Sequence, residues 1–386
     1  MEIHAQPEAS SLKLEAFSSS ELIRYSRHLT LPGFGEEAQQ KLTLAKVLVV
    51  GAGGLGCPVL LYLAAAGIGN IGIVDFDVIH ESNLQRQVLF TTHNIGQNKA
   101  ITASQRLHAL NPTIEFKTFT EKISSHNALS ITEQFDLIVD ATDNFSTRYL
   151  LNDVSVLLKK TLIYGSVFRY EGQVAVFNYK GSPTYRDLYP TPPDAGSVPD
   201  CEQAGVLGVL TGIIGSIQAN EVIKILTGIG EPLVGKLLLL DSLTLETSKI
   251  SIPDRRQREG IHALIDYDYF CGIHNLSNPL TMKEVTVQEL KAMKDANADF
   301  QLIDVREPHE YDICEIGGEL IPMAEVPHNF DKIARNKQVV VHCRSGKRSG
   351  DTIQWLEKNQ GFTNLYNLKG GILAWAKEID TSLETY

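Results

Sequence analysis

The clearest pattern of apolar and polar positions in the chain lies in residues 46–77. An apolar, β-branched run, Val47 to Val50, leads into the turn GAGGLG, and an Ala- and Leu-rich stretch with a helical pattern follows. A second apolar run, Ile71 to Val74, ends at Asp75. The pattern predicts a strand, a tight turn, a helix and a second strand, the unit that binds nucleotides in doubly wound sheets.

The glycine-rich turn, Gly51 to Gly56, has a physical reason to bind phosphate. Glycine permits a tight turn and lets the backbone approach a phosphate closely. The following helix offers unpaired N–H groups and a partial positive charge at its N-terminus. Asp75 is placed to accept hydrogen bonds from ribose hydroxyls. The alternative is a turn that only packs the helix on the sheet.

A polar stretch after Asp75 indicates which kind of nucleotide is bound. It contains Asn83, Arg86 and Lys99. A dinucleotide dehydrogenase has no need for an arginine and a lysine here. A triphosphate does, because its charge must be neutralised while the α-phosphorus is attacked.

Alternating helix and strand signals continue up to Asn144. Residues 100–110 have a helical pattern, and residues 114–119 and 135–139 are extended. The last run leads into DATDN, and an acid at the C-terminal end of a parallel strand lies in the crevice where doubly wound sheets bind ligands. Asp143 is therefore a candidate for a Mg²⁺ or phosphate site. Its alternative role is the N-cap of the next helix.

Two further strands, residues 162–167 and 173–178, precede an aperiodic loop over residues 180–200 that ends at Cys201. A loop of this length inside a domain is more often functional than idle. A long helical pattern follows, and its glycines, spaced three, four and three residues apart, are Gly205, Gly208, Gly212 and Gly215. Each glycine costs a helix ~1 kcal/mol relative to alanine. The stripe therefore predicts close packing, on the sheet or on another subunit.

A reactive thiol is predicted near the end of the chain. The pattern breaks down over residues 251–278, and a short αβ alternation restarts at residue 281. A strand over residues 338–342 delivers Cys343 into a loop of cations and small residues, Arg344, Ser345, Gly346, Lys347 and Arg348, before a helix. Three cations and a helix N-terminus stabilise a thiolate or persulfide. Sulfur transfer and attack on a phosphate ester both fit this loop.

Composition narrows the class of protein. The chain has 386 residues, of which 43% are hydrophobic and 21% charged, and its net charge is 35 − 46 = −11. The negative charge argues against nucleic acid or an anionic membrane as a partner. The longest nearly apolar run, residues 204–217, falls short of the ~20 residues that span a bilayer. No signal peptide is evident, and an odd number of dispersed cysteines favours a reducing, cytoplasmic compartment.

A short helix is predicted near the N-terminus. Ser18 and Glu21 have the spacing of a capping box for the segment ELIRYSRHL. Arg24 and Arg27, three residues apart, share a face of it, and a pair of this kind is usually solvated.

Two resemblances cover nearly the whole chain after its first twenty residues. The last hundred residues resemble a rhodanese domain, with DVREPHEY near its start and a CRSGKRS loop that closes at Arg348, as in sulfurtransferases. The first ~250 resemble adenylating enzymes of the ubiquitin-activating superfamily, above all the molybdopterin-synthase and thiamine-pathway adenylyltransferases. The matching segments are RYSRHLTLPGFGEEAQQKL, GAGGLG, VDFD, SNLQRQ, GQNK, DATDN, GSVFRYEGQVAVF and the Cys201 segment with GVLG.

The resemblance implies a fold, a domain order and a set of partners. The expected fold is α/β, a Rossmann-like adenylating domain with a mostly parallel sheet plus a smaller α/β rhodanese domain. The expected order is a loose leader over 1–20, an adenylyltransferase over 21–255, a linker over 256–280 and a rhodanese-like domain over 281–386. The implied partners are a small ubiquitin-like sulfur carrier ending in GlyGly and a persulfide donor such as a cysteine desulfurase. The pathway stays open among molybdopterin synthesis, thiamine synthesis, tRNA thiolation and a cysteine route.

The resemblance also assigns roles to particular residues. Gly51, Gly53 and Gly54 would hold phosphates, Asp75 would bind ribose, Asn83, Arg86 and Lys99 would hold the triphosphate, and Asp143 would hold Mg²⁺. Arg27 would reach the ATP of a neighbouring subunit, which makes the enzyme a homodimer. Cys343 would carry a persulfide. Cys201 would bond covalently to the activated carrier, unless it only packs.

The implied reaction is ATP-dependent adenylation of the carrier's C-terminal glycine, followed by sulfur transfer from Cys343 to give a thiocarboxylate. The alternative is an activating enzyme for a ubiquitin-like modifier, which forms a Cys201 thioester for conjugation. An NAD-dependent oxidoreductase would share the glycine fingerprint, but SNLQRQ and GQNK argue against it. A non-catalytic scaffold is disfavoured because both sites keep their charged residues.

The sequence departs from the family at its structural zinc site. The family binds zinc through two CxxC pairs, and the corresponding positions here are Thr184 and Asp187, then Asp268 and Cys271. One thiol with oxygen ligands does not make the usual closed tetrahedral site. We therefore expect no structural zinc and a loop held by packing. Cys57 and Cys314 are expected to be ordinary core or surface residues.

Overall fold

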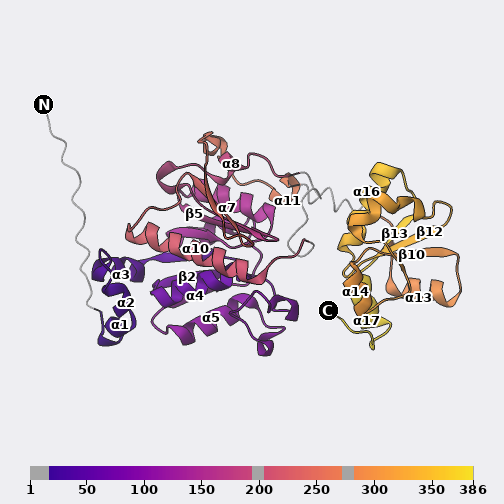
Figure 1. Ribbon diagram of the computed structural model, residues 1–386, viewed down its shortest axis with the longest axis horizontal. Helices are drawn as coiled ribbons and strands as arrows, with labels where there is room; N and C mark the ends of the chain where they lie inside the picture. The colour runs from indigo at the N-terminus through magenta and orange to yellow at the C-terminus, as the bar shows by residue number, and fades with distance from the viewer. Residues whose placement is uncertain (1–16, 194–203, 272–281, 386) are drawn as a thin grey trace. The chain divides into compact units, whose positions relative to one another are not determined.

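The computed structural model describes residues 17–193, 204–271 and 282–385. Contacts divide the chain into two compact units, the first of which ends at Cys271 (Figure 1). Each unit has its own sheet and its own apolar core.

The first unit is built on an eight-stranded sheet in the order β3-β2-β1-β4-β5-β6-β7-β8. Its strands are β1 (Lys46–Val50), β2 (Asn70–Val74), β3 (Glu115–Phe119), β4 (Leu137–Asp140), β5 (Thr161–Phe168), β6 (Glu171–Phe177), β7 (Lys236–Asp241) and β8 (Thr247–Ser251). The pairs among β1 to β5 are parallel, and those from β5 to β8 are antiparallel. The prediction of a mostly parallel Rossmann-like sheet is confirmed.

Helices cover both faces of this sheet. Successive side chains of β1 point to opposite faces and belong to two different apolar cores. Val47 and Val49 belong to one apolar cluster, and Leu48 and Val50 to the other. The helices on the first face are α3 (Gly35–Leu44), α4 (Gly56–Ala66), α5 (Lys99–Leu110) and α10 (Gly208–Thr227). Those on the second are α6 (Ala128–Thr132), α7 (Phe145–Leu157), α8 (Tyr185–Leu188) and α11 (Tyr267–Phe270).

The strand order places a ligand crevice beside β1. The chain goes from β1 to β2 on one side and returns to β4 on the other, so the direction of winding reverses at β1. Ligands of open α/β sheets bind at such a reversal, outside the C-terminal ends of the strands. The turn after β1, Asp75 after β2 and DATDN after β4 all lie at that edge.

The close packing predicted for the glycine stripe is present within the chain at two of its four positions. A Cβ at Gly208 would lie 2.5 Å from the Gln85 carbonyl oxygen, and one at Gly215 would lie 2.5 Å from that of Leu55, so both permit close packing. Gly205 precedes the helix at φ +74°, and Gly212 has open space in front of it. Thus two of the four glycines make close helix contacts among the described residues, and packing of the stripe on another subunit stays a prediction.

Helix α10 is long and apolar enough to cross a membrane by length and composition, with 44% of its most apolar window buried. It extends past the apolar run seen in the sequence. Its buried residues, Leu210, Ile214 and Val222 among them, belong to the core of the first sheet face.

The second unit has a five-stranded parallel sheet in the order β11-β10-β12-β13-β9. Its strands are β9 (Glu284–Val285), β10 (Phe300–Asp304), β11 (Glu319–Leu320), β12 (Gln338–His342) and β13 (Leu365–Leu368). Helix α16 (Lys347–Gln360) packs on one face, and α13 (Val287–Asp295) and α17 (Gly371–Glu378) pack on the other. The predicted second α/β domain is confirmed.

We expect a matched pair of substitutions on α10 to change stability in opposite directions. Gly215→Ala should lower the free energy of unfolding by about 1–3 kcal/mol, because the methyl group overlaps α4. Gly212→Ala should raise it by up to about 1 kcal/mol, since it adds helix propensity without a clash. Urea unfolding measures both. Equal effects of the two would contradict the packing described here.

Candidate active sites

The glycine turn of the first unit leaves no room for a side chain at its two ends. Gly51 has φ +98°, and a Cβ there would lie 2.6 Å from the Ala141 carbonyl oxygen. A Cβ at Gly56 would lie 2.0 Å from the Gly51 carbonyl oxygen. The turn after β1 is thus pressed against the end of β4, and the start of α4 closes over it. Backbone N–H groups are what this turn can present to an anion.

Asp75 is fixed by two backbone groups. Its Oδ2 accepts from the Ala52 N–H at 2.8 Å, and its Oδ1 accepts from the Asp77 N–H at 2.9 Å. Burial raises the pKa of Asp75, while the charge of Lys99 opposes that rise. Lys99 is 6% exposed and pairs with Asp77 at 3.0 Å. The acid and the lysine predicted from the sequence therefore lie at one place.

The SNLQRQ segment adds a residue that the sequence did not single out. Asn83 accepts the His80 N–H, and Arg86 donates to the Ser82 carbonyl at 3.0 Å. Gln87 is 4% exposed, and its Oε1 has no hydrogen-bond partner in the described residues. Its Nε2 would be 3.7 Å from a Cβ on Gly53. A buried amide with an unused oxygen beside the glycine turn is a candidate ligand contact.

The acids after β4 separate into a buried and an exposed one. Asp143 is exposed, and Asn144, not Asp143, caps α7 by accepting the Thr147 N–H at 2.9 Å. The N-cap alternative for Asp143 is therefore wrong. Asp140 is 1% exposed; burial raises its pKa, and its Oδ2 has no partner in the described residues.

Arg148 is a second residue that the sequence reasoning missed. It is 7% exposed on α7 and donates to the Thr142 carbonyl at 3.2 Å. Burial alone lowers the pKa of Arg148, but Tyr164 and Asp140 more than offset this, so the net pKa is raised. Its Nε lacks a partner among the described residues. The sequence did offer one signal for Arg148: it is a cation on the buried face of the helix that follows DATDN.

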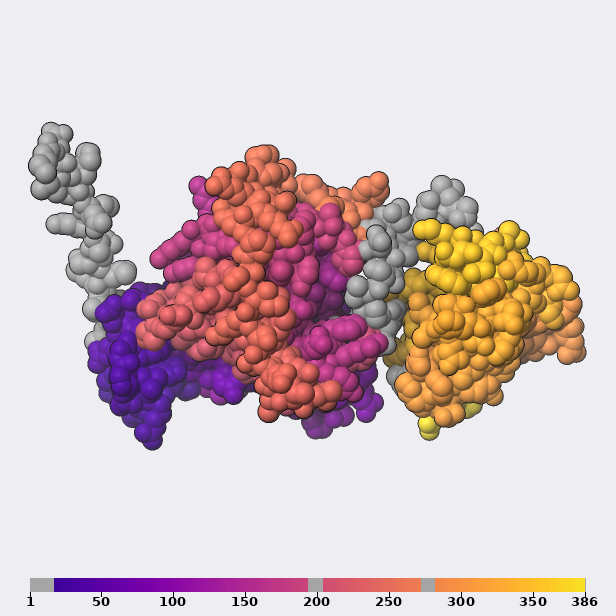
Figure 2. Space-filling view, turned by 45° about the horizontal axis from the view of Figure 1, so that its top comes forward, coloured from indigo at the N-terminus to yellow at the C-terminus, as the bar shows by residue number. Residues whose placement is uncertain are grey.

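Of two further predicted residues, one lies on the surface and the other outside the described residues. Arg27 is exposed on α2 (Ser26–Leu29), in the indigo N-terminal helices on the surface of the first unit (Figure 2). The predicted capping box of Ser18 and Glu21 is present in α1 (Ser19–Arg24). Cys201 lies outside the described residues.

In the second unit, Cys343 follows β12 and its side chain is buried. Its Sγ lies 3.2 Å from the Gly346 N–H and 3.4 Å from the Ser349 hydroxyl. The Ser349 hydroxyl also lies 2.7 Å from Oδ1 of Asn367, whose amide donates to the Gly346 carbonyl at 3.1 Å. The Gly346 N–H is thus held against the sulfur, as a thiolate or persulfide needs, while the sulfur and Oδ1 of Asn367 share the single hydrogen of the Ser349 hydroxyl.

The loop around Cys343 is held by two helix N-termini. Gly346, at φ +94°, is the N-cap of α16. At the start of α17, the Ile372 N–H donates to the Cys343 carbonyl at 2.9 Å, and the Leu373 N–H donates to that of Arg344 at 3.1 Å. Ser345 and Lys347 are exposed, and Arg344 is half-buried. Of the predicted loop residues, Gly346 is thus placed against the sulfur, and roles for the others stay predictions.

The positions of the family's zinc ligands hold a carboxylate network that does not fit a metal. Asp187 is fully buried; its Oδ2 accepts from the Thr184 N–H at 2.7 Å and hydroxyl at 2.8 Å. Its Oδ1 accepts from the N–H groups of Arg255, at 2.8 Å, and Gln257, at 3.2 Å. Both oxygens are thus engaged by four donors, and they tie this loop to the segment after β8. Within the described residues no cluster of metal-ligating side chains occurs.

The second pair of zinc positions is used differently. Asp268 pairs with Lys122 at 3.3 Å, and burial raises the pKa of Cys271 to about 11. Nearby, Asp153 accepts Arg186 at 2.7 and 2.8 Å and the Tyr267 hydroxyl at 2.7 Å. Hydrogen bonds therefore join these segments, where the sequence led us to expect packing alone.

The remaining cysteines are buried. Cys57 is in the core of the first unit, where burial raises its pKa to about 12, and Cys314 is 7% exposed in the second.

The fold and the two sites define a class of enzyme, and comparison with known proteins agrees. The ThiF family matches residues 25–261, and the rhodanese-like domain matches residues 286–378. The chain belongs to the ThiF family, in the group whose members join an adenylyltransferase to a rhodanese-like sulfurtransferase domain.

Particular relatives match along their length. The probable adenylyltransferase/sulfurtransferase MoeZ of Mycobacterium tuberculosis is 42% identical over 96% of this chain and 97% of its own. The adenylyltransferase and sulfurtransferase MOCS3 of Culex quinquefasciatus is 39% identical over 96% of this chain and 90% of its own. The resemblance stated from the sequence is confirmed.

Solved structures support the fold of the first unit. A crystal structure of Escherichia coli MccB with ATP matches with a TM-score of 0.53 at 24% identity, covering 59% of this chain and 71% of that one. A structure of PaaA matches with a TM-score of 0.53 at 23% identity, covering 64% and 77%. At these identities the likeness shows the fold alone.

We expect the stability of this protein to depend on Asp187 and not on metal. EDTA should leave the melting temperature unchanged, and metal analysis of the purified protein should find no stoichiometric zinc. Asp187→Ala should cost about 2–4 kcal/mol, because four buried donors lose their acceptor. Asp268→Ala removes only a partly exposed pair, so it should cost less than about 1 kcal/mol. Stoichiometric zinc would overturn this account.

Proposed function

We propose that this enzyme activates a small ubiquitin-like sulfur carrier ending in GlyGly and converts its C-terminus to a thiocarboxylate. The observation that carries the proposal is the presence on one chain of a glycine turn with an acid and a buried lysine beside it, and of a thiol in a cationic loop. The adenylyltransferase and sulfurtransferase names of relatives that match along their length support both activities.

In the first step the carrier's terminal carboxylate attacks the α-phosphorus of ATP, and the bond to pyrophosphate breaks. The product is an acyl-adenylate, in which AMP has become a leaving group. The nucleophile is already ionised, so no protein base is needed. Arg86 and Lys99 would offset the charge that develops on the phosphates. Gly51, Gly53 and Gly54 would bind the phosphates through backbone N–H groups, and Asp75 would bind the ribose.

Magnesium fits the exposed carboxylate of Asp143, because Mg²⁺ prefers oxygen ligands and keeps several waters. When bound there, it would add positive charge against the triphosphate. Asn83 completes the proposed triphosphate contacts.

In the second step the terminal sulfur of a Cys343 persulfide attacks the acyl carbon, and AMP leaves. The product is an acyl disulfide between the carrier and Cys343. A thiol, from Cys201 or another source, then attacks the Cys343 sulfur. The thiocarboxylate leaves, and Cys343 remains in a disulfide with that thiol. The Gly346 N–H is placed to stabilise sulfur anions on this route, and the Ser349 hydroxyl would do so by turning its hydrogen from Asn367 to the sulfur.

The persulfide would come from a donor such as a cysteine desulfurase, and we place the protein in the cytoplasm. All four cysteines among the described residues, Cys57, Cys271, Cys314 and Cys343, are free thiols, in keeping with a reducing compartment. The alternative function, a Cys201 thioester passed to protein conjugation, gives no role to the Cys343 loop.

We expect the two activities to separate by mutation. Cys343→Ala should abolish thiocarboxylate formation, measured by mass spectrometry of the carrier, but spare ATP–pyrophosphate exchange. Arg86→Ala should lower exchange by about 10²–10³-fold, the usual effect of removing one charge-stabilising donor, and spare sulfur loading of Cys343. Loss of both activities in either variant would contradict the division of labour.

We further propose that the enzyme is a homodimer whose Arg27 reaches the partner's ATP. An open groove of about 730 Å³ between α4 and α10 supports a second copy as the occupant of this surface. Tyr62, Val88 and Val209 line it and are 58%, 64% and 65% exposed. Exposed apolar side chains gathered in one groove are typical of an interface.

We expect Val209→Glu to shift the mass measured by light scattering from dimer to monomer. Leu129→Glu, an exposed leucine on the other face, should leave the dimer intact. Mixing Arg27→Ala with Lys99→Ala subunits should restore exchange to about a quarter of wild type, because half of the dimers then contain one complete site. A monomeric wild type, or no restoration, would refute the shared site.

A further inference from the structure

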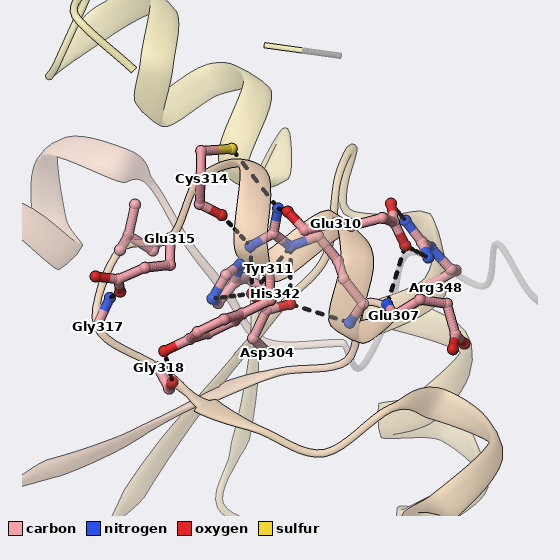
Figure 3. Close-up of polar contacts among 12 residues, drawn as sticks. Asp304, Glu307, Glu310, Tyr311, Cys314, Glu315, Gly317, Gly318, His342 and Arg348 are labelled. Carbon is pink, nitrogen blue, oxygen red and sulfur yellow. Dashed lines mark hydrogen bonds and ion pairs between the residues drawn. The ribbon is translucent and has the colours of Figure 1, made fainter. Parts of the chain in front are cut away.

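The motif DVREPHEY has no role in the steps above, yet its charged residues form a continuous series of ion pairs and hydrogen bonds. Asp304 ends β10, and Arg306 follows two residues later. Glu310 lies in the first turn of α14 (Pro308–Ile313). Figure 3 shows that the series extends from Asp304 to Arg348 of the Cys343 loop.

Arg306 fixes α14 to the strand end. Its guanidinium is fully buried and lies 2.6–3.0 Å from the two carboxylate oxygens of Asp304. It also donates to the carbonyl of Glu310 at 3.1 Å and to that of Cys314, the C-cap of α14, at 2.7 Å. One side chain thus binds both ends of this helix. A planar guanidinium can make these contacts together, whereas a lysine cannot.

Glu310 joins this helix to the Cys343 loop. Its two oxygens accept from Nη1 and Nη2 of Arg348 at 2.6 and 2.7 Å. The exposed fractions of the two side chains are 10% and 17%. A short, bidentate and mostly buried pair fixes both distance and orientation. Arg348 is the second residue of α16, so the pair fixes the point where the loop turns into the helix.

The pair also changes the charge of the loop. The carboxylate of Glu310 neutralises Arg348, while Lys347 is exposed and Arg344 half-buried. The loop N–H that contacts the sulfur belongs to Gly346, two residues before Arg348. A displacement of Arg348 would therefore move this donor relative to Sγ.

We propose that Glu310 is a positioning residue for sulfur transfer: it holds Arg348, and through it the Gly346 N–H, in place around Cys343. Arg306 and Asp304 supply the rigid support for Glu310. This inference rests on the proposed sulfurtransferase activity of Cys343.

The test uses thiosulfate and cyanide with the full-length enzyme. The Cys343 thiolate takes the outer sulfur of thiosulfate and sulfite leaves; cyanide then removes that sulfur as thiocyanate. Glu310→Gln keeps the shape of the side chain and removes its charge. We expect kcat to fall by about 10- to 100-fold, the effect of misplacing a group by up to ~1 Å. KM for the thiosulfate dianion should fall, because Arg348 is no longer neutralised.

The controls separate positioning from stability. Asp312→Asn changes an exposed carboxylate on the same helix and should leave kcat and KM unchanged. Glu310→Asp keeps the charge but shortens the reach, so it should lower kcat less and leave KM unchanged. If Glu310→Asp is the only Glu310 variant that folds, its kcat and KM decide whether Glu310 positions the loop. The exchange Glu310→Arg with Arg348→Glu should recover kcat relative to either single change.

Three outcomes would overturn the inference while the wild type remains active. The first is a kcat of Glu310→Gln within twofold of wild type. The second is a fall in the kcat of this variant that matches its loss of folded protein while KM stays unchanged. The third is that kcat does not recover in the exchange variant. A wild type that transfers no sulfur would instead refute the proposed function itself.

Discussion

One constraint governs both units: parallel strands end at the same edge of a sheet, so the residues that follow them meet there. In the first unit this brings together the turn after β1, Asp75 after β2 and DATDN after β4. In the second it places Arg306 after β10 beside the Cys343 segment after β12. The chemistry of each unit is therefore supplied by loops, and the strands behind them set the spacing.

Buried carboxylates hold segments of both units in place. Asp75 holds two N–H groups beside the glycine turn, Asp187 holds four donors at the zinc positions, and Asp304 holds the Arg306 guanidinium. A buried carboxylate is costly unless its oxygens are engaged, and here each is. At the positions where the resemblance implies zinc ligands, Asp187 instead ties its loop to Arg255 and Gln257 by hydrogen bonds.

The sequence predicted what depends on neighbours along the chain. The glycine turn, the α1 capping box and the Cys343 loop are local patterns, and each is present. Contacts between distant residues were not predictable in this way. Glu310 and Arg348 are 38 residues apart, and Asp187 and Arg255 are 68 apart. The sequence did not single out Gln87 and Arg148, because what distinguishes them is their burial and not their residue type. Cys201 and the roles of the site residues stay predictions.

The groups beside the glycine turn and those that contact the Cys343 sulfur differ in how fully they are paired, and the difference follows from their tasks. Around the first, Gln87, Asp140 and Arg148 each keep a buried atom without a partner in the described residues. Such atoms cost stability in the free protein, and a ligand that engages them regains it. The Cys343 loop instead has contacts from Gly346 and Ser349 already in place. His342, beside it, has two buried ring nitrogens without a hydrogen-bond partner in the described residues, and burial lowers its pKa to about 4, so it adds no charge to the loop. A nucleotide site must change partners with each turnover, whereas a sulfur-carrying thiol needs the same surroundings in both of its states. Preorganisation around Cys343 is thus consistent with a covalent carrier, and incomplete pairing at the glycine turn with a site that binds and releases.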